Sequence, residues 1–312
     1  MPSNKLPEAK IWNRPASCGE GLLLTRLWAP KGTPKAILQI SHGMSEHSGR
    51  YDEFATILVE NGYIVCAEDH AGHGPNAKIK GFFAKKDGWG CVVKDMKGLM
   101  DEVHAQYPNL PLFLFGYSMG SLLARAYITL YGDELSGCIL AGTMGPNPAL
   151  GVGKAMAGIV GLLTGKQHPS YFLGTIALAG TNKRAPGAAS RFSFLTTMKD
   201  EVVKYDNDPD CGFTFTPGGY YDLFNGMCEV NTDEWAKSIP KNLPVYLYSG
   251  ADDPFGGYGK GVGKVYKMIK NAGVRDVELK VYPFGRHELH HETNRQEVFA
   301  DVISHLDKWL AG

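Results

Sequence analysis

Short apolar runs alternate with amphipathic segments along most of this 312-residue chain. Six short runs rich in apolar residues have the length of strands, at residues 35–42, 63–69, 111–117, 137–142, 244–250 and 277–282. Helices are expected at residues 50–61, 90–106, 121–131, 259–271 and 294–310. Strands that alternate with helices indicate a parallel sheet covered on both faces. We therefore expect an α/β protein with a mostly parallel central sheet flanked by helices, to which residues 21–29 add an antiparallel edge strand.

One long region lacks this alternation. It extends from Met144 to about Ile239 and includes residues 151–165, which are apolar nearly all round and interrupted by glycines. A stretch of this length between two core strands indicates an inserted cap rather than a loop. We therefore expect residues 1–143 and 240–312 to form the core, with residues 144–239 as the cap or lid.

Composition excludes several classes of protein. Lysine plus arginine and aspartate plus glutamate each number 32, so the net charge is near zero and a nucleic-acid partner is not expected. No apolar run reaches the roughly 18 residues of a membrane span, and the N-terminus has no apolar run of signal-peptide length. The six cysteines form no C-x-x-C pair, so we expect reduced, mostly buried thiols in a cytoplasmic protein. They are Cys18, Cys66, Cys91, Cys138, Cys211 and Cys228.

The strongest chemical signal is the pentapeptide G-Y-S-M-G at residues 116–120. It follows an expected strand and precedes an expected helix, which is the context of a nucleophile elbow. Small residues at both ends of such a turn let the strand and the helix approach, and the serine hydroxyl then stands above the sheet. The alternative is a chance glycine turn with a capping serine. The pattern favours Ser118 as a nucleophile.

A serine nucleophile needs a base that is oriented by a third group, and in this kind of fold the acid precedes the histidine along the chain. The strand that ends at Gly250 is followed by A-D-D-P, so either Asp252 or Asp253 is a candidate acid. His287 follows the next expected strand and is the candidate base. All of these residues follow the carboxyl ends of strands, where the sites of open α/β sheets lie.

Residues 287–291 also fit H-E-x-x-H, the pattern of zinc proteases. That pattern needs a helix, so that both histidines share one face. Pro283 and Gly285 lie just upstream, and we expect the helix to start near Thr293. We therefore expect no zinc here, and we expect His290 and His291 to be surface or helix-entry residues.

Two further polar loops follow strands. The S-H-G-M-S-E-H-S-G-R-Y segment at residues 41–51 contains a His-Gly turn that can direct a backbone N–H at a developing oxyanion, together with the N–H of Met119. The E-D-H-A-G-H-G segment at residues 68–74 could suggest a metal site. Its glycines favour a tight loop whose polar groups brace the floor of the site.

Together these motifs resemble the monoacylglycerol lipase and lysophospholipase branch of the α/β-hydrolase superfamily. The matching segments are H-G-M-S-E-H-S-G-R-Y, D-H-A-G-H-G, G-Y-S-M-G, G-A-D-D-P and G-R-H-E, in the family's order from residue 42 to residue 288. The resemblance implies an α/β-hydrolase fold with a cap inserted after the sixth core strand. It implies the triad Ser118, Asp253 and His287, and oxyanion N–H groups at Met44 and Met119.

The chain departs from the family at two places. Ser45 stands where the family often has glycine, and Pro75-Asn76 follow G-H-G in place of the common Gln or Arg plus Ser. Neither departure touches the triad. The cap varies most in such enzymes, so the identity of the substrate is the least transferable inference.

We expect a serine hydrolase that cleaves carboxylic esters of monoacylglycerol or lysophospholipid type through an acyl-enzyme, with no cofactor or metal. The alternatives are a small-ester or aryl esterase or a peptidase on the same scaffold, and a non-catalytic binding protein. In the cap, residues 155–163 are apolar and lie between Lys154 and Lys166. They could line an acyl-chain tunnel, contact a membrane or micelle surface transiently, or pack against the core. The oligomeric state is left open.

Overall fold

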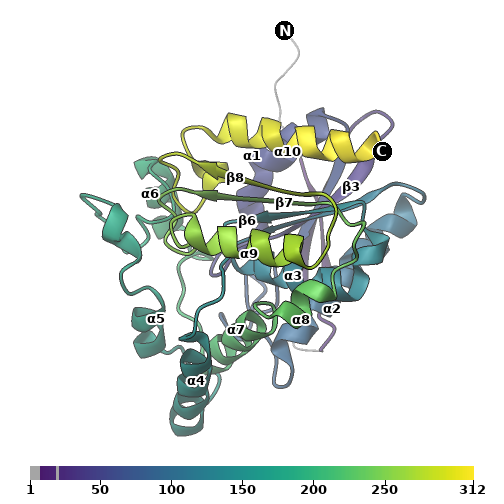
Figure 1. Ribbon diagram of the computed structural model, residues 1–312. Helices are drawn as coiled ribbons and strands as arrows, with labels where there is room; N and C mark the ends of the chain where they lie inside the picture. The colour runs from purple at the N-terminus through teal and green to yellow at the C-terminus, as the bar shows by residue number, and fades with distance from the viewer. Residues whose placement is uncertain (1–7, 19–20) are drawn as a thin grey trace.

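The computed structural model describes residues 8–18 and 21–312, which form an eight-stranded sheet in the order β1-β2-β4-β3-β5-β6-β7-β8 (Figure 1). The strands β1 (Lys10–Pro15) and β2 (Leu22–Trp28) are antiparallel to their neighbours. The other six strands pair in parallel. They are β3 (Ala36–Ser41), β4 (Tyr63–Glu68), β5 (Leu112–Tyr117), β6 (Gly137–Ala141), β7 (Val245–Gly250) and β8 (Val277–Tyr282).

The parallel strands confirm the six sequence predictions to within about a residue. Five of them, β3 to β7, are buried on both faces, whereas β8 lies at the other edge of the sheet and is only partly buried. The prediction for residues 21–29 is right about an antiparallel strand but wrong about the edge. Strand β1 pairs with β2 from Lys10 opposite Leu27 to Pro15 opposite Leu22 and forms the edge itself. Its sequence escaped notice because only alternate positions of β1 are even partly covered.

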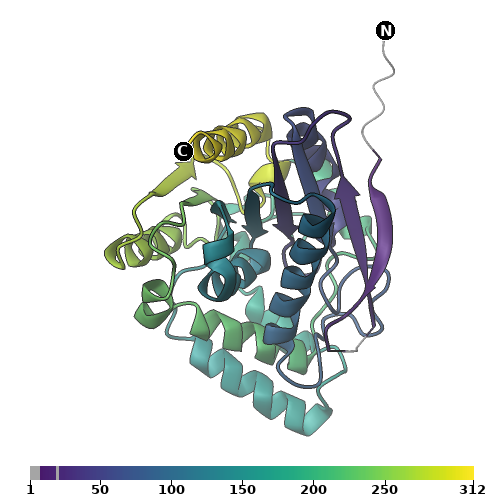
Figure 2. The same ribbon diagram turned by 90° about the vertical axis from the view of Figure 1, so that its right-hand side faces the viewer.

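Helices cover both faces of the sheet (Figures 1 and 2). One face carries α1 (Asp52–Glu60) and α10 (Arg295–Leu310), and the other carries α2 (Gly88–Gln106), α3 (Met119–Tyr131) and α9 (Lys260–Asn271). Successive strand residues point to opposite faces. Ile37 therefore packs in the core beneath α2 and α3, whereas Leu38 packs beneath α1 and α10. This is the predicted α/β-hydrolase architecture.

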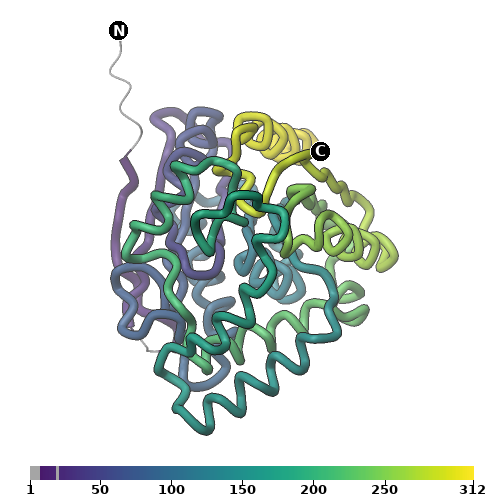
Figure 3. Tube along the Cα trace, turned by 90° about the vertical axis from the view of Figure 1, so that its left-hand side faces the viewer, coloured from purple at the N-terminus to yellow at the C-terminus, as the bar shows by residue number. Residues whose placement is uncertain are grey.

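The region between β6 and β7, which we call the insertion (residues 142–244), is helical. Its helices are α4 (Leu150–Thr164), α5 (Tyr171–Ala177), α6 (Lys199–Asn207), α7 (Pro217–Glu229) and α8 (Asp233–Lys237), with a 3-10 turn, η3, at Thr181–Arg184. Figure 3 views the molecule from the side of the insertion and shows it crossing the end of the sheet. Helix α7 packs on α4 and also on α2 and α3. The division into a core and a cap at residues 144–239 stays a prediction.

One buried arginine joins both ends of the insertion to helix α3. The guanidinium of Arg125 donates to the carbonyl of Met144 at 2.8 Å, to the carbonyl of Val230, and to Oδ1 of Asn231 at 3.0 Å. It also lies 4.2 Å from the centre of the Trp235 ring. Burial lowers the pKa of Arg125 to about 9. The hydrogen bonds therefore satisfy a cation that would otherwise be costly to bury.

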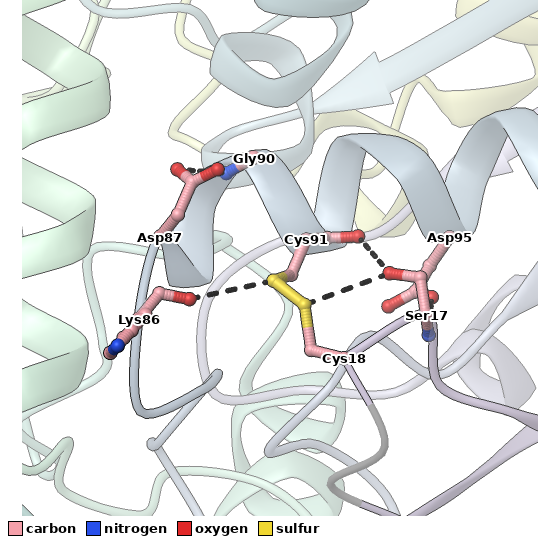
Figure 4. The surroundings of a disulfide bond; sticks show 7 residues. All are labelled: Ser17, Cys18, Lys86, Asp87, Gly90, Cys91 and Asp95. Atoms are coloured by element: carbon pink, nitrogen blue, oxygen red, sulfur yellow. Dashed lines mark hydrogen bonds between the residues drawn. A yellow bond between two sulfur atoms is a disulfide. The ribbon is translucent and has the colours of Figure 1, made fainter.

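The prediction that all six cysteines are reduced is wrong for two of them. Cys18 and Cys91 form a disulfide whose Cα atoms lie 6.0 Å apart and whose partners are separated by 73 residues (Figure 4). Beside it, Ser17 N–H donates to Oδ1 of Asp95 at 2.6 Å. These contacts hold the N-terminal strands to α2. The pairing escaped sequence analysis because spacing alone carries no information on which cysteines meet.

The remaining cysteines, at positions 66, 138, 211 and 228, are free thiols. Among the described residues, no helix combines the length and the apolar character that crossing a bilayer requires. The cytoplasmic location stays a prediction.

Candidate active site

Ser118 occupies a strained turn between β5 and α3. Its backbone has φ 52° and ψ −117°, in a region that residues other than glycine rarely adopt. The flanking glycines explain how the turn closes. A Cβ at Gly116 would lie 2.4 Å from the carbonyl oxygen of Gly120, and one at Gly120 would lie 2.0 Å from that of Ser41. The nucleophile elbow predicted from residues 116–120 therefore has the expected geometry.

His287 and Asp253 lie in line behind Ser118. Nε2 of His287 is 2.8 Å from Oγ of Ser118, and its Nδ1 is 2.8 Å from Oδ1 of Asp253. The side chain of His287 is 2% exposed and that of Asp253 is fully buried. The three residues follow β5, β7 and β8, so the carboxyl ends of three strands bring them together. This arrangement can move a proton from a serine hydroxyl to an imidazole that a carboxylate orients.

The structure separates the two candidate acids. Asp253 also accepts hydrogen bonds from Oγ of Ser249 at 2.8 Å and from N–H of Phe255 at 2.9 Å, so its orientation is fixed. Asp252 instead pairs with the half-exposed Arg184, at 3.1 Å. Of the two, Asp253 is the one beside His287.

The candidate oxyanion donors belong to the elbow and to the loop after β3. Met119 is the first residue of α3, where backbone N–H groups lack an acceptor within the helix. Met44 lies in the loop of residues 42–46, which we call the oxyanion loop, and a Cβ on Gly120 would lie 2.6 Å from the carbonyl oxygen of His42. Among the described turns and loops, neither N–H makes a backbone hydrogen bond. Their role stays a prediction.

Comparison with known proteins agrees with this geometry. The family described as serine aminopeptidase, S33, matches residues 32–294. Human monoglyceride lipase is 30% identical over 93% of this chain and 86% of its own length. The monoglyceride lipase homolog of Monkeypox virus is also 30% identical, over 91% and 92%. The chain belongs to the monoglyceride lipase branch of the α/β-hydrolases.

A solved structure supports the same family. The structure of a thermostable carboxyl esterase from Bacillus coagulans in complex with glycerol has a TM-score of 0.92 and is 30% identical, covering 97% of this chain and 99% of that one. The predicted resemblance and the predicted class, a serine ester hydrolase, are thereby confirmed.

Buried histidines brace the oxyanion loop of this α/β-hydrolase. Nε2 of His42 accepts from N–H of His70 at 3.0 Å, and Nε2 of His73 accepts from N–H of Ser45 at 3.3 Å. Burial lowers the pKa of His42 to about 4, outweighing the nearby Asp69 carboxylate, and burial also lowers the pKa values of His70 and His73. Neutral imidazoles can accept these hydrogen bonds. The geometry agrees with the bracing interpretation of residues 68–74.

These histidines should make the hydrolase sensitive to acid. The pKa of His42 is lower in the folded chain than its ordinary value of 6.5, so the unfolded chain binds the proton more readily. The contribution of His42 is fully present above pH 6.5 and is lost as the pH falls towards 4, by about 2 kcal/mol at pH 5. We expect the melting temperature to fall steadily between pH 7 and pH 5 in calorimetry. A His168→Gln variant, changed at an exposed histidine, should show the same slope, and a flat profile would contradict neutral buried histidines.

An ion-pair network that sequence analysis missed joins the oxyanion loop to the His287 loop. Nη1 of Arg50 lies 2.6 Å from Oε2 of Glu46, and Arg50 donates twice to Glu288, at 2.5 and 2.8 Å. Glu46 in turn accepts from N–H of Gly43 at 2.5 Å. Burial opposes the ionisation of Glu288, but Arg50 outweighs it and lowers the pKa of Glu288 to about 2. The only signal in the sequence was the unassigned polar content of E-H-S-G-R-Y.

The same network explains the H-E-x-x-H pattern. Arg50 occupies the carboxylate of Glu288, and His287 contacts Ser118 and Asp253. His290 and His291 lie in the 3-10 turn η4 (Leu289–His291), before α10. The expectation that His290 and His291 are surface or helix-entry residues agrees with their place at the entry to α10. His290 is nevertheless not a surface residue, since it is 2% exposed and stacks on the Tyr51 ring at 4.9 Å. Aromatic packing buries a histidine that the sequence placed next to an exposed helix entry.

Two groups of described side chains have ligand atoms within 4.8 Å of one another: Glu288, His290 and His291, and His47, Asp208 and Cys211. Arg50 places a positive charge on the carboxylate of the first group. In the second group, Nδ1 of His47 accepts from Gly49 N–H at 3.2 Å. A metal on Nε2 would need a proton on Nδ1, which would then face that donor. Neither group suits a cation.

Proposed function

We propose that this enzyme hydrolyses monoacylglycerols, with Ser118 as the nucleophile, His287 as the general base and Asp253 as the group that orients it. The carrying observation is the pair of 2.8 Å contacts that link the serine, the imidazole and the carboxylate. The relatives named monoglyceride lipases and the esterase structure with glycerol support the substrate class.

The reaction proceeds in two halves. Oγ of Ser118 attacks the ester carbonyl while Nε2 of His287 takes its proton, and the N–H groups of Met44 and Met119 stabilise the oxyanion. The protonated His287 then gives its proton to the leaving glycerol oxygen, which leaves an acyl-enzyme. Water, deprotonated by His287, releases the fatty acid and restores Ser118. Asp253 stabilises the imidazolium in both halves.

The family description raises an aminopeptidase as the rival activity. An aminopeptidase has to bind the ammonium group of its substrate, for which a carboxylate is the usual partner. The buried carboxylates described above are already engaged, Asp253 by His287 and both Glu46 and Glu288 by Arg50. This favours an uncharged ester over a peptide with a free N-terminus.

A substrate panel tests this proposal. We expect the purified enzyme to hydrolyse 1-monoacylglycerols of medium and long chain with a higher kcat/KM than acetate esters, since each buried methylene can contribute about 0.8 kcal/mol. Lysophosphatidylcholine and an aminoacyl p-nitroanilide complete the panel. A higher kcat/KM for either of these, or for the acetate ester, than for the monoacylglycerols would contradict the proposal and assign the enzyme to that activity instead.

The outward face of α4 supports contact with a lipid surface. Within this helix the small residues Ala157 and Gly161 are buried, whereas Leu162 is 83% exposed and Leu163 is 80% exposed. Phe172 of the neighbouring α5 is 60% exposed. Of the three alternatives for residues 155–163, this arrangement favours an interfacial helix over a helix buried against the core. A monoacylglycerol would then enter from the aggregate on which the enzyme rests.

Charging this face should separate surface binding from chemistry. We expect the double variant Leu162→Asp, Leu163→Asp to bind phosphatidylcholine vesicles at least tenfold more weakly in a flotation assay, because two apolar side chains lose their burial in lipid. Its kcat/KM for a water-soluble short ester should stay within about twofold. Leu130→Asp, changed at an exposed leucine of α3, is the matched control. Unchanged vesicle binding in the double variant would contradict the interfacial role.

A further inference from the structure

Ser45 is the residue at which this chain departs from the family's common glycine, and its backbone shows why glycine suits the position. Its φ is 56°, in the left-handed region that costs a side-chain residue free energy. The serine is nevertheless 5% exposed and packed into the structure. A strained serine at this position calls for a compensating interaction.

The polar groups of Ser45 supply that interaction, mostly with the insertion. Its hydroxyl donates to the carbonyl of Phe213 at 2.7 Å. Its carbonyl accepts from the N–H of Gly212 and from the hydroxyl of Tyr205, both at 2.8 Å. Its own N–H donates to His73. Three of these four hydrogen bonds reach residues 205–213 of the insertion, which we call the docking segment.

Neighbouring residues add to the same contact. Nε2 of His47 lies 2.9 Å from Oδ2 of Asp208, and Arg50 lies 4.8 Å from the centre of the Tyr205 ring. Each of these pairs joins the segment that follows β3 to the docking segment, across more than 150 residues of sequence. The insertion is therefore fastened next to Met44, the proposed oxyanion donor.

We propose that Ser45 is a positioning residue, which couples the docking segment to the oxyanion loop so that the insertion sets the place of the Met44 N–H. The inference rests on the proposed function, because it assigns Met44 to the oxyanion. Ser45 touches no reacting atom. It acts by fixing the backbone just after Met44. Without the hydrogen bonds of the Ser45 hydroxyl and carbonyl, the oxyanion loop would be free to shift.

Two substitutions separate the tie from the backbone strain. Ser45→Ala keeps the Cβ and the strain but removes the hydroxyl, whereas Ser45→Gly removes both. Cys211 is a built-in reporter of docking, since its thiol is free, buried and next to Gly212. Cys66 and Cys138 are fully buried in β4 and β6 and report unfolding of the core. Ser238→Ala, which removes a hydroxyl bonded to the carbonyl of Glu234 on α8, is the matched control.

We expect both Ser45 variants to raise the iodoacetamide labelling rate of Cys211 about fivefold, as read by peptide mass spectrometry, with Cys66 and Cys138 unchanged. We expect kcat for a p-nitrophenyl ester to fall about tenfold with KM within about twofold, and inhibition by an alkyl boronic acid to weaken by the same factor. Ser238→Ala should change none of these. Unchanged labelling of Cys211 in both variants would contradict the proposed role of Ser45 in docking. Raised labelling with an unchanged kcat would contradict the coupling between docking and the oxyanion.

The failure of the proposed function would look different. A wild-type enzyme whose Ser118 resists a fluorophosphonate probe would contradict the nucleophile itself, whatever the Ser45 variants do. Normal probe labelling in wild type with no effect of either Ser45 variant would overturn this inference alone.

Discussion

Replacing Ser118 with alanine will lower kcat for ester hydrolysis by a factor on the order of 10³ or more and leave the fold intact. The loss is large because Oγ is the atom that lies 2.8 Å from Nε2 of His287, and alanine offers no nucleophile. The fold should survive, since the change removes one oxygen from a turn whose shape depends on Gly116 and Gly120.

The measurement is steady-state hydrolysis of a p-nitrophenyl ester. Circular dichroism checks the fold, and a fluorophosphonate probe checks that covalent labelling is lost together with Ser118. Ser121→Ala is the matched control, because its hydroxyl is bonded to the carbonyl of Ser118 within the same turn and does not contact His287. Normal turnover by a well-folded Ser118→Ala protein would reject the serine hydrolase mechanism for this site.

The pair of adjacent aspartates allows the second large effect to be tested with a natural control. Asp253→Asn should lower kcat by a factor on the order of 10⁴, because an amide beside Nδ1 of His287 neither holds the needed tautomer nor stabilises the imidazolium. Asp252→Asn should keep kcat within about twofold, since Asp252 pairs with the half-exposed Arg184 and does not meet His287. Exposed pairs of this kind contribute little.

A further comparison concerns the base. His287→Ala should be nearly inactive, and His291→Ala should retain most activity, because His291 lies 3.5 Å from Glu201 and away from Ser118. Equal losses for the two aspartates would show that the acid is not Asp253. Loss of activity on EDTA treatment with recovery on zinc would restore the metalloprotease interpretation of H-E-x-x-H.

The parts of the fold that can be predicted from the sequence are those whose signals are local. The run P-L-F-L-F-G-Y is apolar throughout because β5 is buried on both faces, so its strand could be recognised without any knowledge of its neighbours. Strand β1 carries no such run, because it is an edge strand and most of its residues are exposed to solvent. Its existence depends on pairing with β2, which periodicity does not reveal.

The same division holds for the site. Ser118 is recognisable as a candidate from the five residues around it, and His287 from its place after a strand. The choice of Asp253 over Asp252 came from the family's spacing. Contacts between distant segments were out of reach: Arg50 and Glu288 are 238 residues apart, and Cys18 and Cys91 are 73 apart. No periodicity or spacing encodes which of many polar or sulfur groups will meet.

The anchoring of the insertion by Arg125 bears on how substrate specificity can be exchanged in this scaffold. Helix α3, which begins at the nucleophile, holds both the entrance and the exit of the insertion through one guanidinium. A foreign lid grafted between β6 and β7 would have to present a carbonyl at each of those two places, or leave a buried cation without acceptors. Compatibility in a chimera therefore depends less on the length of the exchanged segment than on this three-way junction. In such a chimera the junction at Arg125, Met144 and Val230 is the part of the recipient to retain.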